Sequence, residues 1–390
     1  MSSKIARNEL IEAIHDSELK LAIALTGGGS GLISELLSIP GASQTILEAN
    51  VPYSQESLAQ FLGRTPESFC SSDTSQMMAV RAYFNSLRTH ESSAIGEEIA
   101  AIGCTAALAS KSPKKGEHRF YKSIQTSNMT LQSHVILDKG ARSRSEEEKL
   151  LVEIGLSELA QLIGVRYEPV GLSVNDRIQK FKIEVSDDWA KVFHGVQPVC
   201  CANRQTDELP RGVGILAGSF NPLHQGHLEM AEVFEKRIGR PVHFELAIRN
   251  ADKPPIDYLT ITQRVDQFAS QPVWLTYAAT FLEKSRLFPG NQFIVGIDTI
   301  VRISDPAYYA GSEGFREAIR ELKSNDCRFV VFGRYDGSKF LTLSDVSVDE
   351  DIVGLCDEIP ESDFRKDISS TSIRVQSLNE SSTNPAELFG

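Results

Sequence analysis

The chain has 390 residues, of which 41% are hydrophobic and 24% are charged, which suits two or three globular domains of roughly 150 residues each. Its formal net charge of −12 opposes general attraction to nucleic acid, although a local basic pocket stays compatible with that charge. Residues 1–18 mix charges among apolar positions and no apolar run reaches membrane-spanning length, so we expect a cytoplasmic protein that binds small molecules.

The cysteines are scattered along the chain and form no CxxC pair. This spacing indicates neither a zinc site nor a disulfide framework, and we expect no protein-bound metal cluster. The cysteines are Cys70, Cys104, Cys200, Cys201, Cys327 and Cys356.

Residues 1–164 have the pattern of one α/β domain. A helix and a strand lead into a glycine loop and a second helix, and β-rich segments follow at 120–125 and 133–137. Residues 145–164 carry helical apolar spacing with acidic residues in the first turn, so this helix is expected to close the domain.

Residues 165–211 lack a clear period and contain Pro169, Pro198 and Pro210. We interpret this stretch as a segment that connects two domains. Its apolar side chains leave two forms open, a passive linker or an adaptor that packs between the domains.

From residue 212 to 390, short strands alternate with helices, which predicts a doubly wound parallel sheet. The expected strands are 214–217, 242–247, 273–276, 293–297 and 328–332. Open sheets of this kind bind ligands at the carboxyl ends of their strands.

A glycine- and histidine-bearing loop directly follows the first of these strands, and a serine-rich segment follows near the end of the chain. His224 and His227 stand three residues apart at an expected helix start, with Gly226 between them to admit a phosphate. The later segment offers hydroxyls and amides at an expected helix start and then a guanidinium at Arg374. Histidine pairs also cap helices, and serine-rich helix starts are common, so the ordered pair of segments carries the functional interpretation.

Residues 218–227 resemble the GxFxPxHxGH signature of the nucleotidyltransferase superfamily, and residues 368–374 resemble its ISSTxxR signature. The second signature has the form typical of nicotinamide or nicotinate mononucleotide adenylyltransferases. The resemblance implies catalytic roles for His224, His227, Lys253 and Arg374. It also implies nucleotide contacts from Gly218, Ser219, Phe220, Asn221, Gly226, Gly296, Asp298, Ile368, Ser369, Ser370 and Thr371.

Three further features extend this resemblance. They are Arg264 in the helix after Lys253, the GxD-like segment 296–298 near the riboses, and Gly333-Arg334 at the end of a strand. The family often stacks its pyridine substrate on an aromatic side chain, for which Trp274, Tyr308 and Tyr309 are available, although such side chains more often belong to the core.

The implied activity is Mg²⁺-dependent adenylyl transfer from ATP to nicotinate or nicotinamide mononucleotide, which yields a dinucleotide and pyrophosphate. Mg²⁺ is expected to bridge phosphate oxygens without a dedicated protein cage. One alternative is transfer of CMP or AMP to another phosphorylated small molecule. Another is a nucleotide-binding sensor or scaffold with weak catalysis.

The first domain resembles the C-terminal domain of the CinA family, which includes nicotinamide mononucleotide deamidases. The resemblance covers about residues 5–164 and rests on segments 24–31, 40–43, 53–56 and Lys115-Gly116. It implies a ligand pocket formed by Thr26, Gly27, Gly28, Gly29, Ser30 and Tyr53, with glycine-loop amides turned toward phosphate.

Two positions depart from the active deamidases. Thr26 stands where they have a serine nucleophile, and Leu58 stands where they have the activating lysine. Because a hydroxyl needs a nearby base to become a nucleophile, we expect the deamidase activity to be impaired or lost, with the ligand pocket retained.

Overall fold

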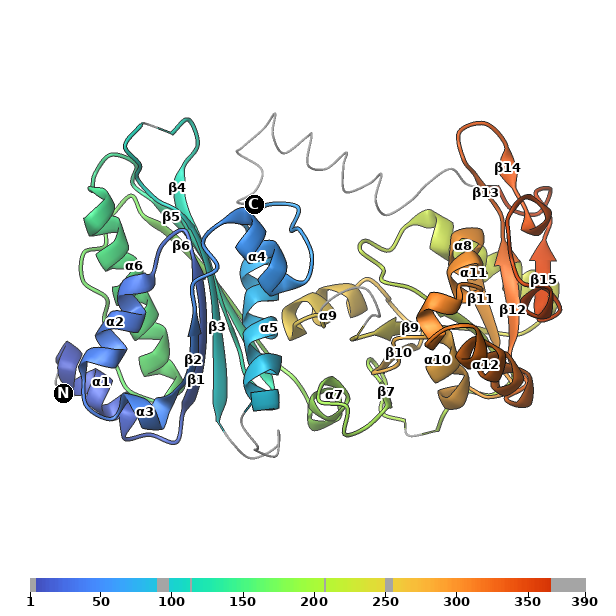
Figure 1. Ribbon diagram of the computed structural model, residues 1–390, viewed down its shortest axis with the longest axis horizontal. Helices are drawn as coiled ribbons and strands as arrows, with labels where there is room; N and C mark the ends of the chain where they lie inside the picture. The colour runs from blue at the N-terminus through green and yellow to red at the C-terminus, as the bar shows by residue number, and fades with distance from the viewer. Residues whose placement is uncertain (1–4, 90–97, 113, 207, 250–254, 366–390) are drawn as a thin grey trace. The chain divides into compact units, whose positions relative to one another are not determined.

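A computed structural model describes residues 5–89, 98–112, 114–206, 208–249 and 255–365. The chain forms two compact units, residues 1–190 with 253–260, and residues 191–252 with 261–390. Both contain a mixed or parallel sheet covered by helices, so the expected α/β fold class is confirmed (Figure 1).

The first unit is built on a six-stranded sheet in which β1 lies parallel to both of its neighbours and the later strands are antiparallel. The order is β2 (Ile46–Asn50), β1 (Lys20–Thr26), β3 (Ile99–Ala107), β4 (His118–Gln125), β5 (Met129–Leu137) and β6 (Arg177–Glu184). Because β1, β2 and β3 are parallel, their carboxyl ends lie at the same end of the sheet, and the glycine loop follows β1 there.

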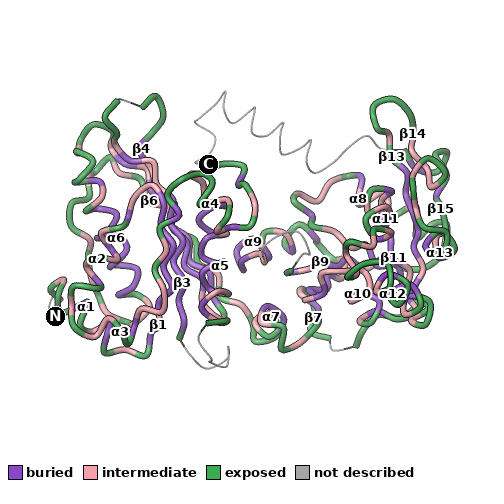
Figure 2. Tube along the Cα trace, viewed as in Figure 1, coloured by how far each residue is buried: buried purple, intermediate pink, exposed green. Residues whose placement is uncertain are grey.

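Helices cover both faces of this sheet (Figure 1). On one face lie α1 (Arg7–His15), α2 (Ser30–Ser38), α3 (Ala42–Thr45) and α6 (Arg144–Leu162), and on the other lie α4 (Gln55–Leu62) and α5 (Ser72–Thr89). Alternate β1 side chains, including Leu21 and Ile23, join apolar side chains of α1, α2 and α6 in one buried core. Figure 2 shows that the central part of this sheet is largely buried. Helix α5 packs so closely on β3 that a Cβ at Gly103 would lie 2.1 Å from the Ser75 carbonyl oxygen.

A short segment from later in the chain, residues 255–260, also packs in the first unit. The Tyr258 side chain is fully buried there and its hydroxyl donates a hydrogen bond to the Ser127 carbonyl at 2.5 Å. The Asp257 carboxylate accepts from the Thr260 amide at 3.0 Å, and burial raises the pKa of this carboxyl.

The second unit has a seven-stranded sheet in which all strands are parallel except β7. The order is β15 (Cys356–Ile359), β12 (Arg328–Phe332), β11 (Gln292–Gly296), β8 (Gly214–Ala217), β9 (Val242–Ala247), β10 (Val273–Thr276) and β7 (Val199–Cys201). The strand order therefore reverses between β8 and β11, and open sheets bind ligands at such a reversal. The doubly wound parallel sheet expected from the alternating pattern is confirmed.

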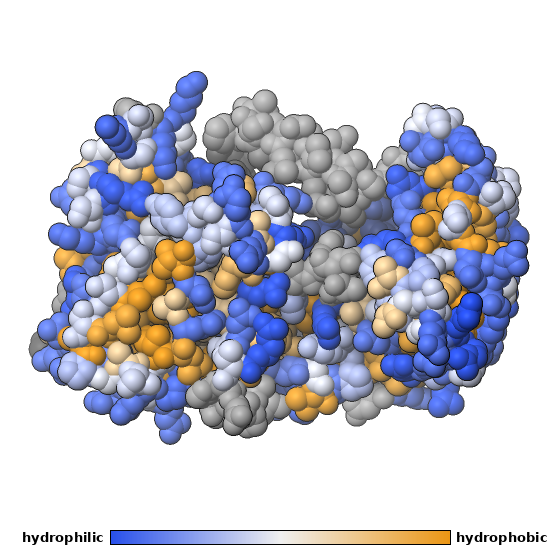
Figure 3. All heavy atoms as spheres, in the orientation of Figure 1, coloured by the Kyte–Doolittle hydropathy of each residue, from blue (hydrophilic) through white to orange (hydrophobic). Residues whose placement is uncertain are grey.

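The second unit contains two longer helices, α8 (Gln225–Ile238) and α12 (Ser312–Ser324). Its short helices are α10 (Phe281–Leu287), α11 (Ile297–Ile303) and α13 (Glu350–Val353), and it includes the part of α9 (Tyr258–Val265) from Ile261 onward. Two 3-10 turns, Pro306–Tyr309 and Leu343–Asp345, and a small hairpin of β13 (Arg334–Tyr335) and β14 (Phe340–Leu341) complete it. In Figure 3 the visible faces of both units mix hydrophilic and apolar side chains.

The segment interpreted as a connection contributes strands to both sheets. β6 adds to the edge of the first sheet, β7 adds to the edge of the second, and α7 (Asp187–Phe193) stands between these strands in the sequence. β6 is largely exposed and rich in charged side chains, and it was not among the expected strands although Phe181 and Ile183 alternate with charged neighbours. Among the described residues, no helix is long and apolar enough to cross a membrane.

Candidate functional site

The carboxyl ends of β8 and β11 lie side by side in the second sheet. Leu216 pairs with Ile294 in the parallel register, which brings the loop after Ala217 beside Gly296. The histidine-bearing loop and the GxD-like segment, about 80 residues apart in the sequence, therefore meet where the strand order reverses.

The loop after β8 is anchored by the buried ring of Phe220. This side chain has no exposed surface and makes edge-on contacts with the rings of Phe268, His227 and Phe244 at centroid distances of 5.0, 5.2 and 5.7 Å. Its backbone φ of 44° lies in the left-handed region, which a bulky residue rarely adopts. A Cβ on Gly218 would lie 2.7 Å from the Phe220 ring, so glycine is required there for this path.

Gln267, two residues after the end of α9, forms hydrogen bonds with the backbone of the same loop. Its Oε1 accepts a hydrogen bond from the Leu223 amide at 2.7 Å, and its Nε2 donates to the Phe220 carbonyl at 2.9 Å. Two polar backbone groups flanking Asn221-Pro222 are thus satisfied by one side chain. Nothing in the sequence around Gln267 marks this role, because its partners are 44 and 47 residues away along the chain.

The two histidines of the loop lie against each other at the start of α8. Their rings are stacked with centroids 3.8 Å apart, and the His224 amide donates a hydrogen bond to Nδ1 of His227 at 3.3 Å. Because Nδ1 of His227 accepts, the proton of the neutral ring belongs on Nε2, which can donate to a ligand. A Cβ on Gly226 would lie 3.1 Å from the His224 ring, so the glycine also leaves room for that ring.

Burial keeps both imidazoles uncharged near neutral pH. It lowers the pKa of His224, and together with the neighbouring His224 it lowers the pKa of His227 to about 4. Nδ1 of His224 is buried without a hydrogen-bond partner in the structure. The pair is therefore suited to donate hydrogen bonds to phosphate oxygens rather than to supply positive charge.

The GxD-like segment forms the start of α11, with Gly296 as its N-cap residue. The exposed Asp298 carboxylate forms an ion pair with Arg334, the residue that follows Gly333 after β12. The structure thus joins two of the features that extended the family resemblance, and it places Asp298 one strand away from the histidine loop.

The aromatic candidates for stacking a pyridine differ in exposure. Trp274 is 2% exposed in β10, and its indole N–H donates to His243 at 3.0 Å, so it belongs to the core. Tyr308 and Tyr309 are half-buried after α11, where the Arg302 guanidinium lies 5.7 Å from the Tyr308 ring centroid.

A buried ion pair that the sequence did not reveal lies beneath the histidine loop. Nζ of Lys284 is 2.5 Å from Oε2 of Glu245, and the Thr276 hydroxyl donates to the same carboxylate. Glu245 pairs with Ala217 in the sheet, and its backbone carbonyl accepts a hydrogen bond from the Gly218 amide at 3.0 Å. Removal of either partner would leave an uncompensated charge in the core. The ion pair therefore stabilises the strand ends that carry the loop only while Lys284 and Glu245 are both present.

The remaining predicted contacts divide into exposed residues and residues outside the described ranges. Ser219 and Asn221 are exposed on the loop, and Arg264 is half-buried in α9. Lys253, Ile368, Ser369, Ser370, Thr371 and Arg374 lie outside the described residues. The described ranges contain no group of three or more His, Cys, Asp or Glu side chains that could hold a metal ion.

The first unit has a pocket of about 490 Å³ at the carboxyl end of β1. Five of the six residues expected to form a ligand pocket line it: Thr26, Gly27, Gly28, Ser30 and Tyr53. Leu25, Val51, Arg144, Ser145 and Glu148 complete the lining. Leu58 is 2% exposed in α4, where it packs in the interior.

The amides of the glycine loop face a carboxylate of the protein instead of an open space for phosphate. The Gly29 amide lies 2.8 and 2.9 Å from the two Glu148 oxygens, and the Gly31 amide lies 3.3 Å from one of them. Glu148 was missed by the sequence reasoning, because it stands 119 residues from Gly29 and looks like one member of an exposed acidic run.

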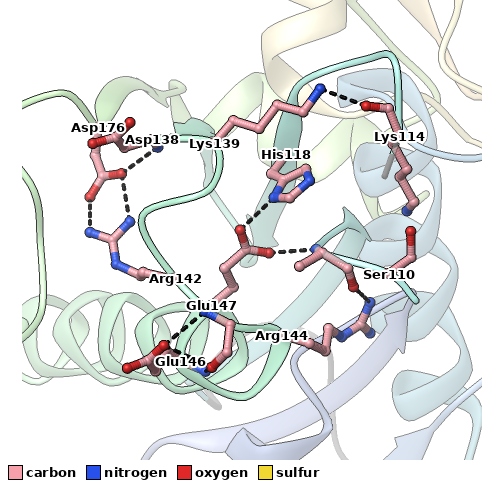
Figure 4. Close-up of polar contacts among 12 residues, drawn as sticks. Ser110, Lys114, His118, Asp138, Lys139, Arg142, Arg144, Glu146, Glu147 and Asp176 are labelled. Carbon is pink, nitrogen blue, oxygen red and sulfur yellow. Dashed lines mark hydrogen bonds and ion pairs between the residues drawn. The ribbon is translucent and has the colours of Figure 1, made fainter. Parts of the chain in front are cut away.

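The neighbouring residues of α6 fasten other loops around this pocket (Figure 4). Glu147 is fully buried and accepts from the Ala109 amide and from His118, each at 2.6 Å. Arg144 donates to the Gly27 carbonyl at 2.7 Å. The first turn of α6 therefore holds the glycine loop and the β3–β4 connection in place.

A protein family model matches part of the second unit. Residues 215–376 match the cytidylyltransferase-like family, which confirms a domain of the nucleotidyltransferase superfamily in the second unit. No curated protein matches the chain.

Solved structures of CinA-like proteins are also similar to this chain. The competence/damage inducible protein CihA of Agrobacterium tumefaciens is 19% identical, with a TM-score of 0.33, and the match covers 42% of this chain and 99% of that protein. A CinA superfamily protein of Enterobacter cloacae is 17% identical, with a TM-score of 0.32 over 42% of this chain and 94% of its own. An Escherichia coli member is 14% identical, with a TM-score of 0.32 over 42% and 95%.

The stacking of the two histidines makes the titration of His227 testable. In the intact protein its pKa, lowered from 6.5 to about 4, should leave the ring neutral above about pH 5. Replacing His224 by alanine exposes the ring and removes the neighbouring charge, so the pKa of His227 should rise toward 6.5. Imidazole NMR titration measures both values.

The same shift has a consequence for stability. Between pH 6.5 and about 4 the unfolded chain binds a proton that the folded chain does not, so the contribution of His227 to the free energy of unfolding should fall as the pH drops through this window. A wild-type His227 that titrates near 6.5 would contradict the buried arrangement.

Proposed function

We propose that the protein is a nucleotidyltransferase that transfers the adenylyl group of ATP to nicotinate or nicotinamide mononucleotide. The observation that carries the proposal is the pair of neutral, stacked histidines at the start of α8, placed where the strand order reverses. The choice of a pyridine mononucleotide is supported by the form of the serine-rich signature at residues 368–374 and by the resemblance of the first domain to a deamidase family.

In the proposed reaction, a phosphate oxygen of the mononucleotide attacks the α-phosphorus of ATP. The bond from that phosphorus to the bridging oxygen of the β-phosphate breaks, and pyrophosphate leaves with the electron pair. The protein contributes alignment and donors for the charge that develops on the phosphates, and no covalent intermediate with the chain is needed.

The residues of the proposed site have different roles in this reaction. Nε2–H of His227 and the ring of His224 donate to phosphate oxygens, and the N-terminus of α8 adds its partial positive charge. Since both imidazoles are neutral, positive charge has to come from elsewhere, and we assign it to Lys253 and Arg374. Mg²⁺ would bind to phosphate oxygens of ATP and offset part of their negative charge.

A second candidate is cytidylyl or adenylyl transfer to another phosphorylated small molecule. The cytidylyltransferase-like match over residues 215–376 favours it, because this family description does not specify a pyridine acceptor. A nucleotide-binding sensor with weak catalysis is a further alternative.

Product analysis separates these proposals. We expect the full chain, given ATP, Mg²⁺ and either pyridine mononucleotide, to form a dinucleotide and pyrophosphate that mass spectrometry detects. Because one preorganised donor is lost, His224→Ala should lower the rate by about 10²–10³-fold. His194→Ala, a histidine change in the same unit outside the loop, should leave the rate near that of the wild type.

Two outcomes would redirect the assignment. Product formed only from CTP, or only with a different phosphorylated acceptor, would retain nucleotidyl transfer and reject the pyridine assignment. Nucleotide binding by calorimetry with no product from any pair would favour the sensor.

Gln267 is proposed as a positioning residue for the histidine loop. Gln267→Ala removes the hydrogen bonds to the Phe220 carbonyl and the Leu223 amide, so the loop can shift relative to the bound phosphates. Misplacement of this kind should lower kcat about 10- to 100-fold and change the KM for ATP much less.

The matched control is Gln271→Ala, a glutamine whose side chain accepts only a long contact of 3.4 Å from the Ser270 amide. It should keep wild-type kcat and KM. Equal losses in the two variants would reject a specific role for Gln267 in placing the histidines.

For the first unit we propose a retained ligand pocket with an impaired deamidase. Thr26 lines the pocket, but the described residues of the lining include no lysine or histidine that could take its proton, and Glu148 is engaged by loop amides. Leu58, at the position of the family's activating lysine, is buried. The His224→Ala protein should therefore release no ammonia from nicotinamide mononucleotide in a coupled assay, whereas sustained release would reject this proposal.

A further inference from the structure

The amides of the glycine loop in the first unit donate hydrogen bonds to a carboxylate of the same unit. Both oxygens of Glu148 lie within 2.9 Å of the Gly29 amide, one oxygen lies 3.3 Å from the Gly31 amide, and the Ser30 hydroxyl lies 3.4 Å from it. Charge-assisted hydrogen bonds of this kind are among the stronger ones in proteins. The carboxylate thus occupies the place at the start of α2 that a bound anion would take.

The start of α6 is fixed where it presents this carboxylate. Ser143 caps the helix and pairs reciprocally with Glu146, and the next residue, Glu147, is buried against the Ala109 amide and His118. Arg144 reaches the Gly27 carbonyl from the same turn. Glu148 is therefore held beside the glycine loop by the contacts of the N-cap residue and the first turn of α6, and its position is part of the packed structure.

An anion that entered the loop would have to displace this carboxylate or lie against it. The space above Gly28 is also limited, since a Cβ at that residue would already lie 3.1 Å from Oε2 of Glu148. Two negative groups in contact within a half-buried pocket repel each other strongly, and the amides can satisfy only one of them.

We propose that Glu148 closes the glycine loop to phosphate and makes the pocket selective for uncharged or cationic aromatic compounds. The exposed ring of Tyr53 and the exposed side chain of Val51 offer an apolar wall for a planar ring. The Glu148 carboxylate offers an acceptor for an amide or amino group on that ring. This inference rests on the proposal that the first unit retains a ligand pocket and is independent of nucleotidyl transfer.

The test compares isosteric ligands on the full chain and reads out the glycine loop itself. Hydrogen exchange of the peptide covering residues 24–36 is followed by mass spectrometry with nicotinamide, with nicotinate, which is its anionic analogue, and with inorganic phosphate. In the wild type, nicotinamide should slow exchange at a concentration at least tenfold lower than nicotinate, and phosphate should have no effect.

Two variants separate charge from space. Glu148→Gln keeps the size and removes the charge, so the preference for nicotinamide over nicotinate should shrink at least tenfold. Glu148→Ala frees the amides, so exchange should be faster without ligand and should be slowed by phosphate. Glu35→Ala removes a carboxylate of α2 that pairs with Arg7 instead of the glycine loop, and it should behave like the wild type.

The outcomes decide between an open and a closed loop. Protection of the wild-type peptide by phosphate would overturn the proposal, because the loop would then accept anions with Glu148 present. Failure of phosphate to protect the folded Glu148→Ala protein would overturn it as well. Failure of all three ligands to protect any variant, with adenylyl transfer intact, would reject the pocket and leave the proposed function of the second unit standing.

Discussion

The buried ring of Phe220 fixes the path of the chain from β8 to α8, and the candidate site of the second unit depends on that path. With its ring held between Phe244, Phe268 and His227, the backbone turns through a left-handed conformation directly after the strand. This turn delivers His224 to the N-cap of α8, and one helical turn later His227 returns its Nδ1 to the His224 amide. A loop set in this way is preorganised before any ligand binds.

This arrangement also decides the electrostatics of the site. The ring stacking and burial that orient the two imidazoles disfavour their protonation, as the pKa of about 4 for His227 indicates. Neutral donors stabilise the developing negative charge through hydrogen bonds of fixed direction, and they add no positive charge to the site. It follows that a site for a triphosphate on this scaffold needs cationic partners from other segments, which is the part that the sequence resemblance assigns to Lys253 and Arg374.

Local patterns in the sequence were sufficient for most parallel strands of the second sheet and for the histidine loop, but the parallel edge strand β15 was not among the expected strands. The strands β8, β9, β10 and β12 coincide with the predicted ranges, because buried parallel strands are short continuous apolar runs. The features that were missed depend on partners far away in the chain. The exposed, charged strand β6 is recognised by its antiparallel pairing with β5. The Gln267 side chain hydrogen-bonds to a loop 44 residues earlier, and the Glu148 carboxylate hydrogen-bonds to a loop 119 residues earlier. No local motif marks these two side-chain contacts.

The two units use the same local architecture in opposite ways. In each, a parallel strand ends in a glycine-bearing loop that leads into a helix N-terminus, which is a general site for anions. In the second unit the residues at that terminus are neutral hydrogen-bond donors, and the Gly226 position stays small. In the first unit the equivalent amides already hold the carboxylate of Glu148. A glycine loop before a helix therefore indicates where an anion can be held, and the side chain that approaches it from another helix determines whether that anion is a ligand or part of the protein.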